Sequence, residues 1–303
     1  MQVHCMMDFT KMYKNIALFI LLLVCLPSAA QYKKKAINFP DSRETDMIDR
    51  GFHDSVAISA VRVLYEHTSM TDTLARDNFN QSVYVLQIAR NGVSLFENYD
   101  FLQLDSAFTS RSSGGKISVK DYKDAWYSVP GTKMNSPQYW KNYPEKQKQT
   151  FYNFASMAQW TYTQENPNFG WEIFSDSVKT VMDYPCIMAV GNYAGRKWKV
   201  WFSLDIPFSD GPWKLCGLPG LILMAEDSRG EFFFRAYSLQ NMEQTMFCTY
   251  GNAFQTTRER YLKTMADYMA NGRNQIIATG LVTGTDLQQS FANGRPYNPI
   301  ELY

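Results

Sequence analysis

The sequence predicts a mainly β protein, built as one domain around a strongly curved antiparallel sheet or half-barrel with a C-terminal helix. Three observations favour this fold class. Apolar residues alternate with polar ones over most of the chain, which is the period of a strand. The dipeptide Asn91-Gly92, a strong signal for a tight hairpin, separates two such segments. Near the end of the chain, residues 256–272 have the period of an amphipathic helix.

The alternating segments form a series of expected strands joined by short turns. In the first segment, Val61, Val63 and Tyr65 occupy every second position. The turns at 194–196 and 227–230 each contain a glycine, which tolerates a positive φ. We expect roughly nine or ten strands, with the clearest at 57–66, 82–90, 93–101, 151–163, 171–174, 186–193, 197–203, 221–226 and 232–239.

Residues 102–148 interrupt this series. They contain Ser112-Ser113-Gly114-Gly115, Pro130-Gly131 and a basic run that ends at Lys148. Such residues are typical of turns and loops. We therefore expect a loop-rich insertion with a short helix at most, and we interpret the basic run as a solvated face.

The helix expected at 256–272 begins at a threonine cap, Thr256 or Thr257, and ends at Asn271-Gly272. One face carries a stripe of tyrosine and methionine, made of Tyr261, Met265, Tyr268 and Met269. A stripe of this kind is typical of a helix that packs on a sheet, so we expect core packing and not a ligand site.

Composition limits the function classes. The 303 residues include 45% hydrophobic residues, which is enough to bury a core. The 30 Lys and Arg almost balance the 29 Asp and Glu. A chain with a net charge of only +1 has no general field to attract nucleic acid, so we expect no nucleic-acid partner.

The first thirty residues have the pattern of a secretory signal peptide. Lys11 and Lys14 precede the apolar run from Ile16 to Leu26, and Ser28-Ala29-Ala30 supplies a small-residue cleavage site. We expect cleavage after Ala30 and export to the periplasm or the outer membrane. A buried N-terminal helix is the alternative. The run is too short to span a bilayer, and we expect no integral membrane span.

Cys25 allows a second form of export, in which the protein is a lipoprotein. Leu22-Leu23-Val24-Cys25 loosely resembles a lipobox, in which the cysteine is acylated. Val24 fits this pattern poorly, because a small residue is usual before the cysteine. Cleavage after Ala30 therefore remains our main interpretation, and the domain is expected to span 31–303.

One long motif carries a family resemblance. Its residues are Gly211, Pro212 and Trp213, followed by Gly217, Leu218, Pro219, Gly220, Leu221 and Ile222, which spell GLPGLI. With flanking matches at 171–202 and 298–302, the sequence resembles the GLPGLI family of exported Gram-negative bacterial proteins over essentially the whole chain after residue 30. The resemblance implies export and no established activity. The order of elements is also similar to the curved sheets of LolA/LolB-type lipoprotein carriers, although fold analogy alone assigns no function.

The motif predicts a stiff connection between strands. Proline fixes φ, and glycine permits conformations closed to other residues. We expect this connection to cross the edge of the sheet and to lead into the next strand. It is either purely architectural, or it lines the mouth of an apolar cavity or a docking surface.

Catalytic and metal motifs are lacking in the sequence, and no cofactor is expected. We find no G-x-S-x-G elbow, H-E-x-x-H motif or C-x-x-C pair. After residue 30 the only histidines are His53 and His67, and neither lies in a recognised motif, so we interpret both as ordinary surface or strand residues. Carboxylates for an Asp/Glu-dependent periplasmic hydrolase would be Asp205, Asp210, Glu226 and Asp227.

The cysteines allow two interpretations. An exported protein meets an oxidising compartment, in which Cys186 and Cys216 could form a disulfide. The alternative is that these two and Cys248 are three buried thiols.

The aromatic residues suggest ligand binding. On the strand 197–203, Trp198 and Trp201 point to opposite faces, so both faces carry aromatic area. The candidate ligand-binding residues are Trp198, Trp201, Trp213, Leu218 and Leu221. They favour an exported, non-catalytic envelope protein that binds either an apolar ligand, such as a lipid or a peptide, or an outer-membrane protein as its partner. The alternatives are the hydrolase and a purely structural interaction module with an exposed apolar patch.

Overall fold

The structure is a computed structural model that describes residues 42–51, 53–74, 76, 78–129, 137–155, 158–278 and 297–302. The expected signal peptide, residues 1–30, lies outside the described residues. The chain divides into two units, Met1–Glu44 and Thr45–Tyr303, and all the helices and strands below belong to the second unit.

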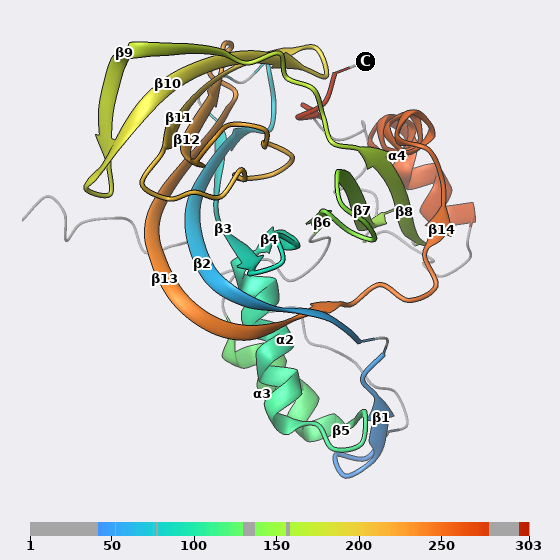
Figure 1. Ribbon diagram of the computed structural model, residues 1–303. Coiled ribbons are helices and arrows are strands. Elements are labelled where there is room, and N and C mark those ends of the chain that lie inside the picture. Colours follow the sequence, from blue (N-terminus) through green and yellow to red (C-terminus); the bar gives the residue numbers. More distant parts are fainter. Residues whose placement is uncertain are drawn as a thin grey trace, which may run out of the picture. The chain divides into compact units, whose positions relative to one another are not determined.

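Twelve of the described strands form one sheet, in the order β14-β8-β7-β6-β4-β3-β2-β13-β12-β11-β10-β9 (Figure 1). All neighbours are antiparallel except β14 and β8. The strands are β2 (Asp54–Met70), β3 (Phe79–Ala89), β4 (Ser94–Asn98), β6 (Gln138–Lys141), β7 (Lys148–Ala155), β8 (Ala158–Glu165), β9 (Glu172–Val181), β10 (Tyr184–Tyr193), β11 (Arg196–Ser203), β12 (Leu221–Asp227), β13 (Phe232–Cys248) and β14 (Phe254–Gln255). A separate pair consists of β1 (Met47–Asp49) and β5 (Lys116–Ser118).

The curvature of the sheet comes from its two longest strands. β2 and β13 have 17 residues each and pair along most of their length. Their register shifts at three places, and such irregularities bend a strand and increase its twist. Figure 1 shows both strands following one long arc. The edge strands β9 and β14 do not pair with each other in the described sheet, which is therefore curved and not closed. The predicted mainly β, curved antiparallel fold is confirmed.

The segment 102–148 is more ordered than a loop-rich insertion. It holds most of helix α2 (Tyr99–Arg111), all of α3 (Val119–Ser128), β5 and β6. Each helix starts at a polar cap: Asn98 Oδ1 accepts from Asp100 N at 2.9 Å, and Ser118 Oγ accepts from Asp121 N at 3.0 Å. Helix α2 contacts β3 and β4 and covers part of the convex face.

Helix α4 (Arg258–Ala278) follows the sheet. Thr257 Oγ1 accepts from Arg260 N at 3.3 Å, so Thr257 caps the helix, which continues past the expected end at Gly272. Tyr261 and Leu262 are buried against the aromatic side chains of β7 and β8. Among the described helices, none offers a stretch that is both long and apolar enough to cross a membrane.

The motif connection 204–220 joins β11 to β12, which are neighbours inside the sheet. The expectation that it crosses the sheet edge is therefore wrong. Its polar groups are held from inside the fold: buried Lys141 pairs with Asp210 and donates to Leu215 O at 3.2 Å. Tyr65 donates to Ile222 O at 2.8 Å, just after the connection ends. These contacts keep the connection against the main core.

Candidate functional site

A row of aromatic side chains crosses four neighbouring strands on the concave face. The register places Phe96 opposite Tyr139, Tyr139 opposite Phe151, and Phe151 opposite Tyr162. Directly opposite residues share one face of a sheet. The ring centroids of successive pairs lie 6.2, 5.0 and 4.9 Å apart. We call these four residues the aromatic row.

The aromatic row forms the floor of a cavity of about 240 Å³. Its walls come from β2, β3 and β13, from Trp213 of the motif connection, and from α4, which contributes Tyr261, Leu262 and Met265. The segment 297–302, here called the strap, adds Tyr297, Asn298, Pro299, Ile300 and Glu301. Residues from both halves of the sequence therefore enclose one largely aromatic space.

Three polar side chains in the wall have atoms without a hydrogen-bond partner among the described residues. They are His67 Nε2, Asn153 Oδ1 and Trp213 Nε1, all inaccessible to water. The remaining polar atoms of two of these side chains are engaged: Asn153 Nδ2 donates to Tyr261 Oη at 2.6 Å, and His67 Nδ1 lies 3.3 Å from Ser82 Oγ. Buried polar groups normally find a partner.

Burial keeps His67 and Tyr84 of this wall uncharged at neutral pH. Desolvation lowers the pKa of His67 to about 4 and raises the pKa of Tyr84 to about 12. The His67 ring is stacked on Phe234, with centroids 4.5 Å apart. His67 is thus a neutral part of the cavity wall, which the sequence interpretation as an ordinary strand residue did not anticipate.

One end of the cavity is charged. The carboxylate of Glu301 forms ion pairs with Lys214, at 2.5 Å, and with Arg258. Lys214 also donates to Tyr162 Oη at 2.9 Å. Burial lowers the pKa of Lys214, and the charge of Glu301 opposes this shift.

A second clamp holds the strap by its backbone. Arg196, which is fully buried, donates to Pro299 O at 2.7 Å, to Ile300 O at 3.0 Å and to Asn298 Oδ1 at 2.9 Å. Its Nη1 atom donates to Asp227 and Glu231, at 2.7 Å each. All five donors that a guanidinium offers are therefore used.

The five residues expected to bind ligand do not lie together at this cavity. Trp213 lines it, and its ring centroid is 5.3 Å from that of Trp198. Trp198, Leu218 and Leu221 are fully buried in the main core. Trp201 points to the opposite face, where Lys199 is exposed and Lys179 Nζ lies 5.1 Å from the Trp201 ring centroid. The alternation expected on this strand holds, but most of the expected residues serve packing.

Most of the cavity wall was not predicted. The aromatic row comes from β4, β6, β7 and β8, which pair in chain order, but β6 lies in the segment that was expected to be loop-rich. Only the aromatic density of 151–163 signalled part of it. Glu301 and Lys214 gave no sequence signal beyond lying in segments that resemble the family motif.

The acidic residues suggested for hydrolysis are separated from one another by their partners. Asp210 is paired with Lys141, and Asp227 with Arg196. Glu226 pairs with Lys199 near the surface, and Asp205 is exposed. Within the described part of the chain, no group of three or more His, Cys, Asp and Glu side chains is placed to hold a metal ion.

Of the two interpretations left open for the cysteines, the disulfide between Cys186 and Cys216 is not formed. Both residues and Cys248 are buried free thiols. Cys186 Sγ lies 3.4 Å from Tyr184 O on its own strand, whereas Cys216 Sγ lies 3.5 Å from Gln149 Nε2. Burial raises the pKa of both thiols to about 11, so both stay protonated and unreactive at neutral pH.

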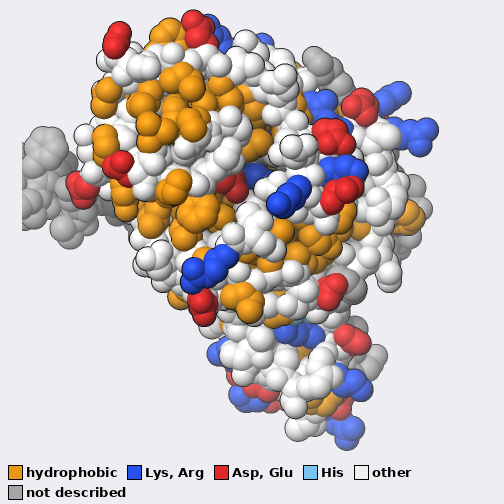
Figure 2. All heavy atoms as spheres, in the orientation of Figure 1, with side chains coloured by type: hydrophobic (Ala, Val, Ile, Leu, Met, Phe, Trp, Pro, Cys, Tyr) orange, Lys and Arg blue, Asp and Glu red, His pale blue; other side chains and the backbone are white. Residues whose placement is uncertain are grey.

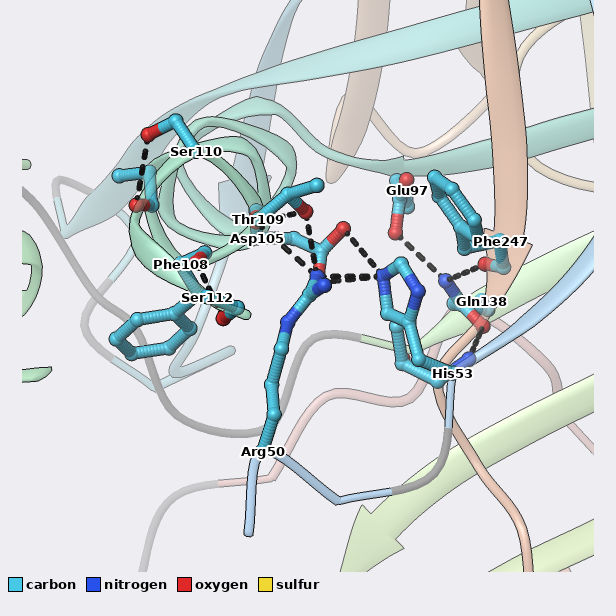
Figure 3. Close-up of polar contacts among 12 residues, drawn as sticks. Arg50, His53, Glu97, Asp105, Phe108, Thr109, Ser110, Ser112, Gln138 and Phe247 are labelled. Carbon is cyan, nitrogen blue, oxygen red and sulfur yellow. Dashed lines mark hydrogen bonds and ion pairs between the residues drawn. The ribbon is translucent and has the colours of Figure 1, made fainter. Parts of the chain in front are cut away.

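A second polar cluster joins the segment before β2 to helix α2 (Figure 3). Arg50 donates to Asp105 Oδ1 at 2.8 Å and to Thr109 Oγ1 at 2.6 Å. His53 Nε2 lies 2.9 Å from Asp105 Oδ2, and its ring centroid is 3.8 Å from that of Phe247. The cluster fastens this segment onto α2, so His53, like His67, has a role that its sequence context did not reveal.

Glu97 lies beside this cluster, on the other side of His53 (Figure 3). Gln138 Nε2 donates to Glu97 Oε2 at 2.9 Å and to Phe247 O at 3.1 Å. Burial, assisted by the charge of Asp105, raises the pKa of Glu97 to about 8. Glu97 is therefore mostly protonated at neutral pH.

Hydrophobic side chains also gather on the surface, over β9 to β12 (Figure 2). The exposed ones in this region include Ile173, Val178 and Leu204, which are 45%, 62% and 52% exposed. β9 is an edge strand, and apolar side chains on an edge favour contact with another chain.

Comparison with known proteins gives a short family match. A family model described as "Protein of unknown function (Porph_ging)" matches residues 194–224, which cover β11, the motif connection and the start of β12. No curated protein matches the sequence.

Solved structures offer a distant likeness. Two structures of PNGF-II, solved in different space groups, have TM-scores of 0.47 and 0.44 at 12% identity. The likeness covers 70% of this chain but 34% of PNGF-II, so this chain spans about a third of that protein's length. Similarity at this level supports no conclusion about function.

Proposed function

We propose that the protein is an exported, non-catalytic binding protein of the cell envelope, and that it holds a small apolar ligand in the aromatic cavity. The observation that carries the proposal is the cavity itself. It combines an aromatic floor with a wall in which burial keeps His67 and Tyr84 neutral and in which Glu301 supplies a carboxylate at one end. Binding sites for small molecules have this character: mostly apolar, with a few polar groups that orient the ligand.

The volume narrows the ligand class. An apolar cavity of ~150 Å³ accommodates benzene. The cavity here, at about 240 Å³, suits a substituted aromatic ring or a short acyl chain. A long lipid would need to extend beyond it.

The pairing of the described acidic residues with basic residues favours ligand binding over hydrolysis. A hydrolase needs two carboxylates that converge on one reacting atom. Here Asp210 and Asp227 are each neutralised by their own buried base. Pairing of this kind stabilises the fold and leaves neither carboxylate available for acid–base chemistry.

The cellular location and the family membership of the protein are also part of the proposal. Export rests on the signal pattern of residues 1–30. Membership of the GLPGLI family rests on the hexapeptide at 217–222, which lies within the stretch matched by the family of unknown function.

Titration calorimetry with 3-phenyl-1-propanol tests the proposed function. This neutral probe matches the aromatic wall and the volume. Wild-type protein is expected to bind it saturably, and Met265→Trp, which fills the cavity, is expected to lose at least tenfold in affinity. Met265→Leu is the matched control and keeps wild-type affinity. Absence of saturable binding to the wild type, or equal binding to Met265→Trp, would contradict the proposal.

A surface interaction module is the second candidate function. The exposed apolar side chains near β9 favour it. Sedimentation velocity would detect a larger species that Val178→Asp abolishes. A monomer at all concentrations would count against self-association through this surface.

A further inference from the structure

Two basic side chains meet at one carboxylate beside the cavity. Lys214 is 1% exposed and pairs with Glu301, as does Arg258. Aromatic rings surround the two cations: Lys214 Nζ lies 5.1 Å from the Tyr162 centroid, and the Arg258 guanidinium carbon lies 5.6 Å from the Tyr193 centroid. Water therefore screens the charge of Lys214 little, whereas Arg258 is half-buried and partly solvated.

This arrangement needs a negative charge. Two neighbouring cations in a poorly solvated site repel each other, and a buried charge without a partner is strongly destabilising. Glu301 supplies the only carboxylate that pairs with both of them in the described part of the chain. Arg258 Nη2 has no acceptor among the described residues, so the pairing with Glu301 leaves donor capacity of this guanidinium unused.

Glu301 belongs to the ligand cavity as well as to the ion pair. Its side chain lines the cavity, whereas the backbone of the strap is held separately by Arg196 and by Leu302 N, which donates to Ala194 O at 2.8 Å. The attachment of the strap therefore does not depend on the Glu301 side chain alone.

We propose that Lys214 and Arg258, which pair with Glu301 and do not themselves line the cavity, form an anion site that a ligand reaches by displacing the Glu301 side chain, and that the ligand is an apolar carboxylate whose head group replaces Glu301. In the absence of ligand, Glu301 occupies the position of that head group. The inference rests on the proposed function and adds the chemical class: an aryl or short acyl carboxylate, with its apolar part on the aromatic row and its charge on Lys214 and Arg258.

The test compares two probes of nearly equal shape, 3-phenylpropionate and 3-phenyl-1-propanol, by titration calorimetry. Glu301→Gln removes the competing charge and keeps the shape of the side chain. We expect it to bind the carboxylate at least tenfold more tightly than the wild type does, because the ligand no longer displaces an ion pair. The affinity for the alcohol is expected to change less than twofold.

A second substitution separates the anion site from a general loosening of the cavity. In Glu301→Gln/Lys214→Met, the gain for the carboxylate is expected to disappear while the alcohol still binds. Replacing both partners of a buried ion pair by neutral groups is generally tolerated. Equal gains for both probes in Glu301→Gln, or a carboxylate gain that survives Lys214→Met, would overturn the inference.

The outcomes also distinguish this inference from the proposed function. If the alcohol binds to no variant, the cavity is not a binding site and the proposed function fails. If the alcohol binds and the carboxylate shows no gain in Glu301→Gln, only the anion site fails. Should Glu301→Gln be unfolded alone, 3-phenylpropionate is expected to restore its thermal transition and the alcohol is not; failure of that rescue also contradicts the inference.

Discussion

Glu97 is a carboxyl group that the fold keeps mostly uncharged at neutral pH. It is 2% exposed, its pKa is raised to about 8 by burial, and the hydrogen bond from Gln138 only partly offsets this shift. Ionising a buried carboxyl group costs more free energy in the folded protein than in the unfolded chain, where water solvates the carboxylate. Residue 97 therefore links stability to pH.

Glu97→Gln is expected to be more stable than the wild type at alkaline pH. The folded-state pKa of Glu97 lies above its ordinary value, so the wild-type free energy of unfolding falls as pH rises from about 4.5 through 8. The variant lacks this fall, which gives it an advantage on the order of 4 kcal/mol at pH 9. Urea unfolding at pH 5, 7 and 9 measures the difference.

Glu243→Gln is the control for this series. Glu243 is 75% exposed and pairs with exposed Arg90 at 3.6 Å, so its substitution should leave the pH dependence parallel to that of the wild type. A Glu97→Gln curve that also runs parallel would show that Glu97 ionises freely in the folded protein.

Residue-level prediction from sequence succeeded where the signal was local and failed where it depended on partners. The alternation of Trp198 and Trp201 follows from strand geometry alone. The roles of His53, His67 and Glu97 depend on side chains from other elements, such as Asp105, Phe234 and Gln138. No spacing in the sequence encodes those contacts.

At the level of elements, the path of the motif connection depends on a close approach between its own backbone and the backbone at the end of β11. A Cβ atom added at Gly220 would lie 2.0 Å from Ser203 O. Backbone atoms at the end of β11 cannot move away without breaking the pairing with β12. A side chain at position 220 would therefore clash with the backbone, and glycine is required there for steric reasons.

Gly220→Ala is expected to cost about 3 kcal/mol of unfolding free energy or more, because overpacking against rigid backbone is poorly relieved. Gly230→Ala is the control. Gly230 has a positive φ of 68° and open space around it, so it should cost only about 1–2 kcal/mol. Chemical denaturation of both variants gives the comparison. Equal losses would mean that the connection can shift.

Elements with strong local signals were predicted well. The hairpin at Asn91-Gly92 joins β3 to β4, and the turns at 194–196 and 227–230 join the expected neighbours. The segment 102–148 was expected to be loop-rich because the glycines at 114 and 115 favour turns, and the extent of helices α2 and α3 was not predicted. The caps Asn98 and Ser118 are signals that could have found both helices.

At the scale of the whole molecule, the strap connects the last described residues to the middle of the chain. Arg196 carries this connection through contacts to the strap and to two buried carboxylates. Such long-range order is not encoded by any local pattern, and neither is the strand order that brings β8 to one side of the sheet and β9 to its far edge. The fold class was predictable because it follows from local strand periodicity. The cavity was not predictable because it depends on this long-range order.

Arg196→Met is expected to destabilise the protein by about 3–5 kcal/mol, because Asp227 and Glu231 lose the cation that neutralises them inside the fold. Arg229→Met, at an exposed position in the neighbouring turn, should stay within about 0.5 kcal/mol of the wild type. Thermal unfolding measures both. A small effect at Arg196 would show that the strap is not structurally coupled to the sheet.

The most direct test of ligand binding in the aromatic cavity is an NMR titration of protein labelled at its methionine methyl groups, with 3-phenyl-1-propanol as the probe. Met265 lines the cavity, whereas Met224 lies on the outer face with its sulfur 3.3 Å from Lys179 Nζ. The account predicts a saturable shift of the Met265 resonance and an unchanged Met224 resonance. A Met265 signal that does not move, or a shift confined to Met224, would contradict it.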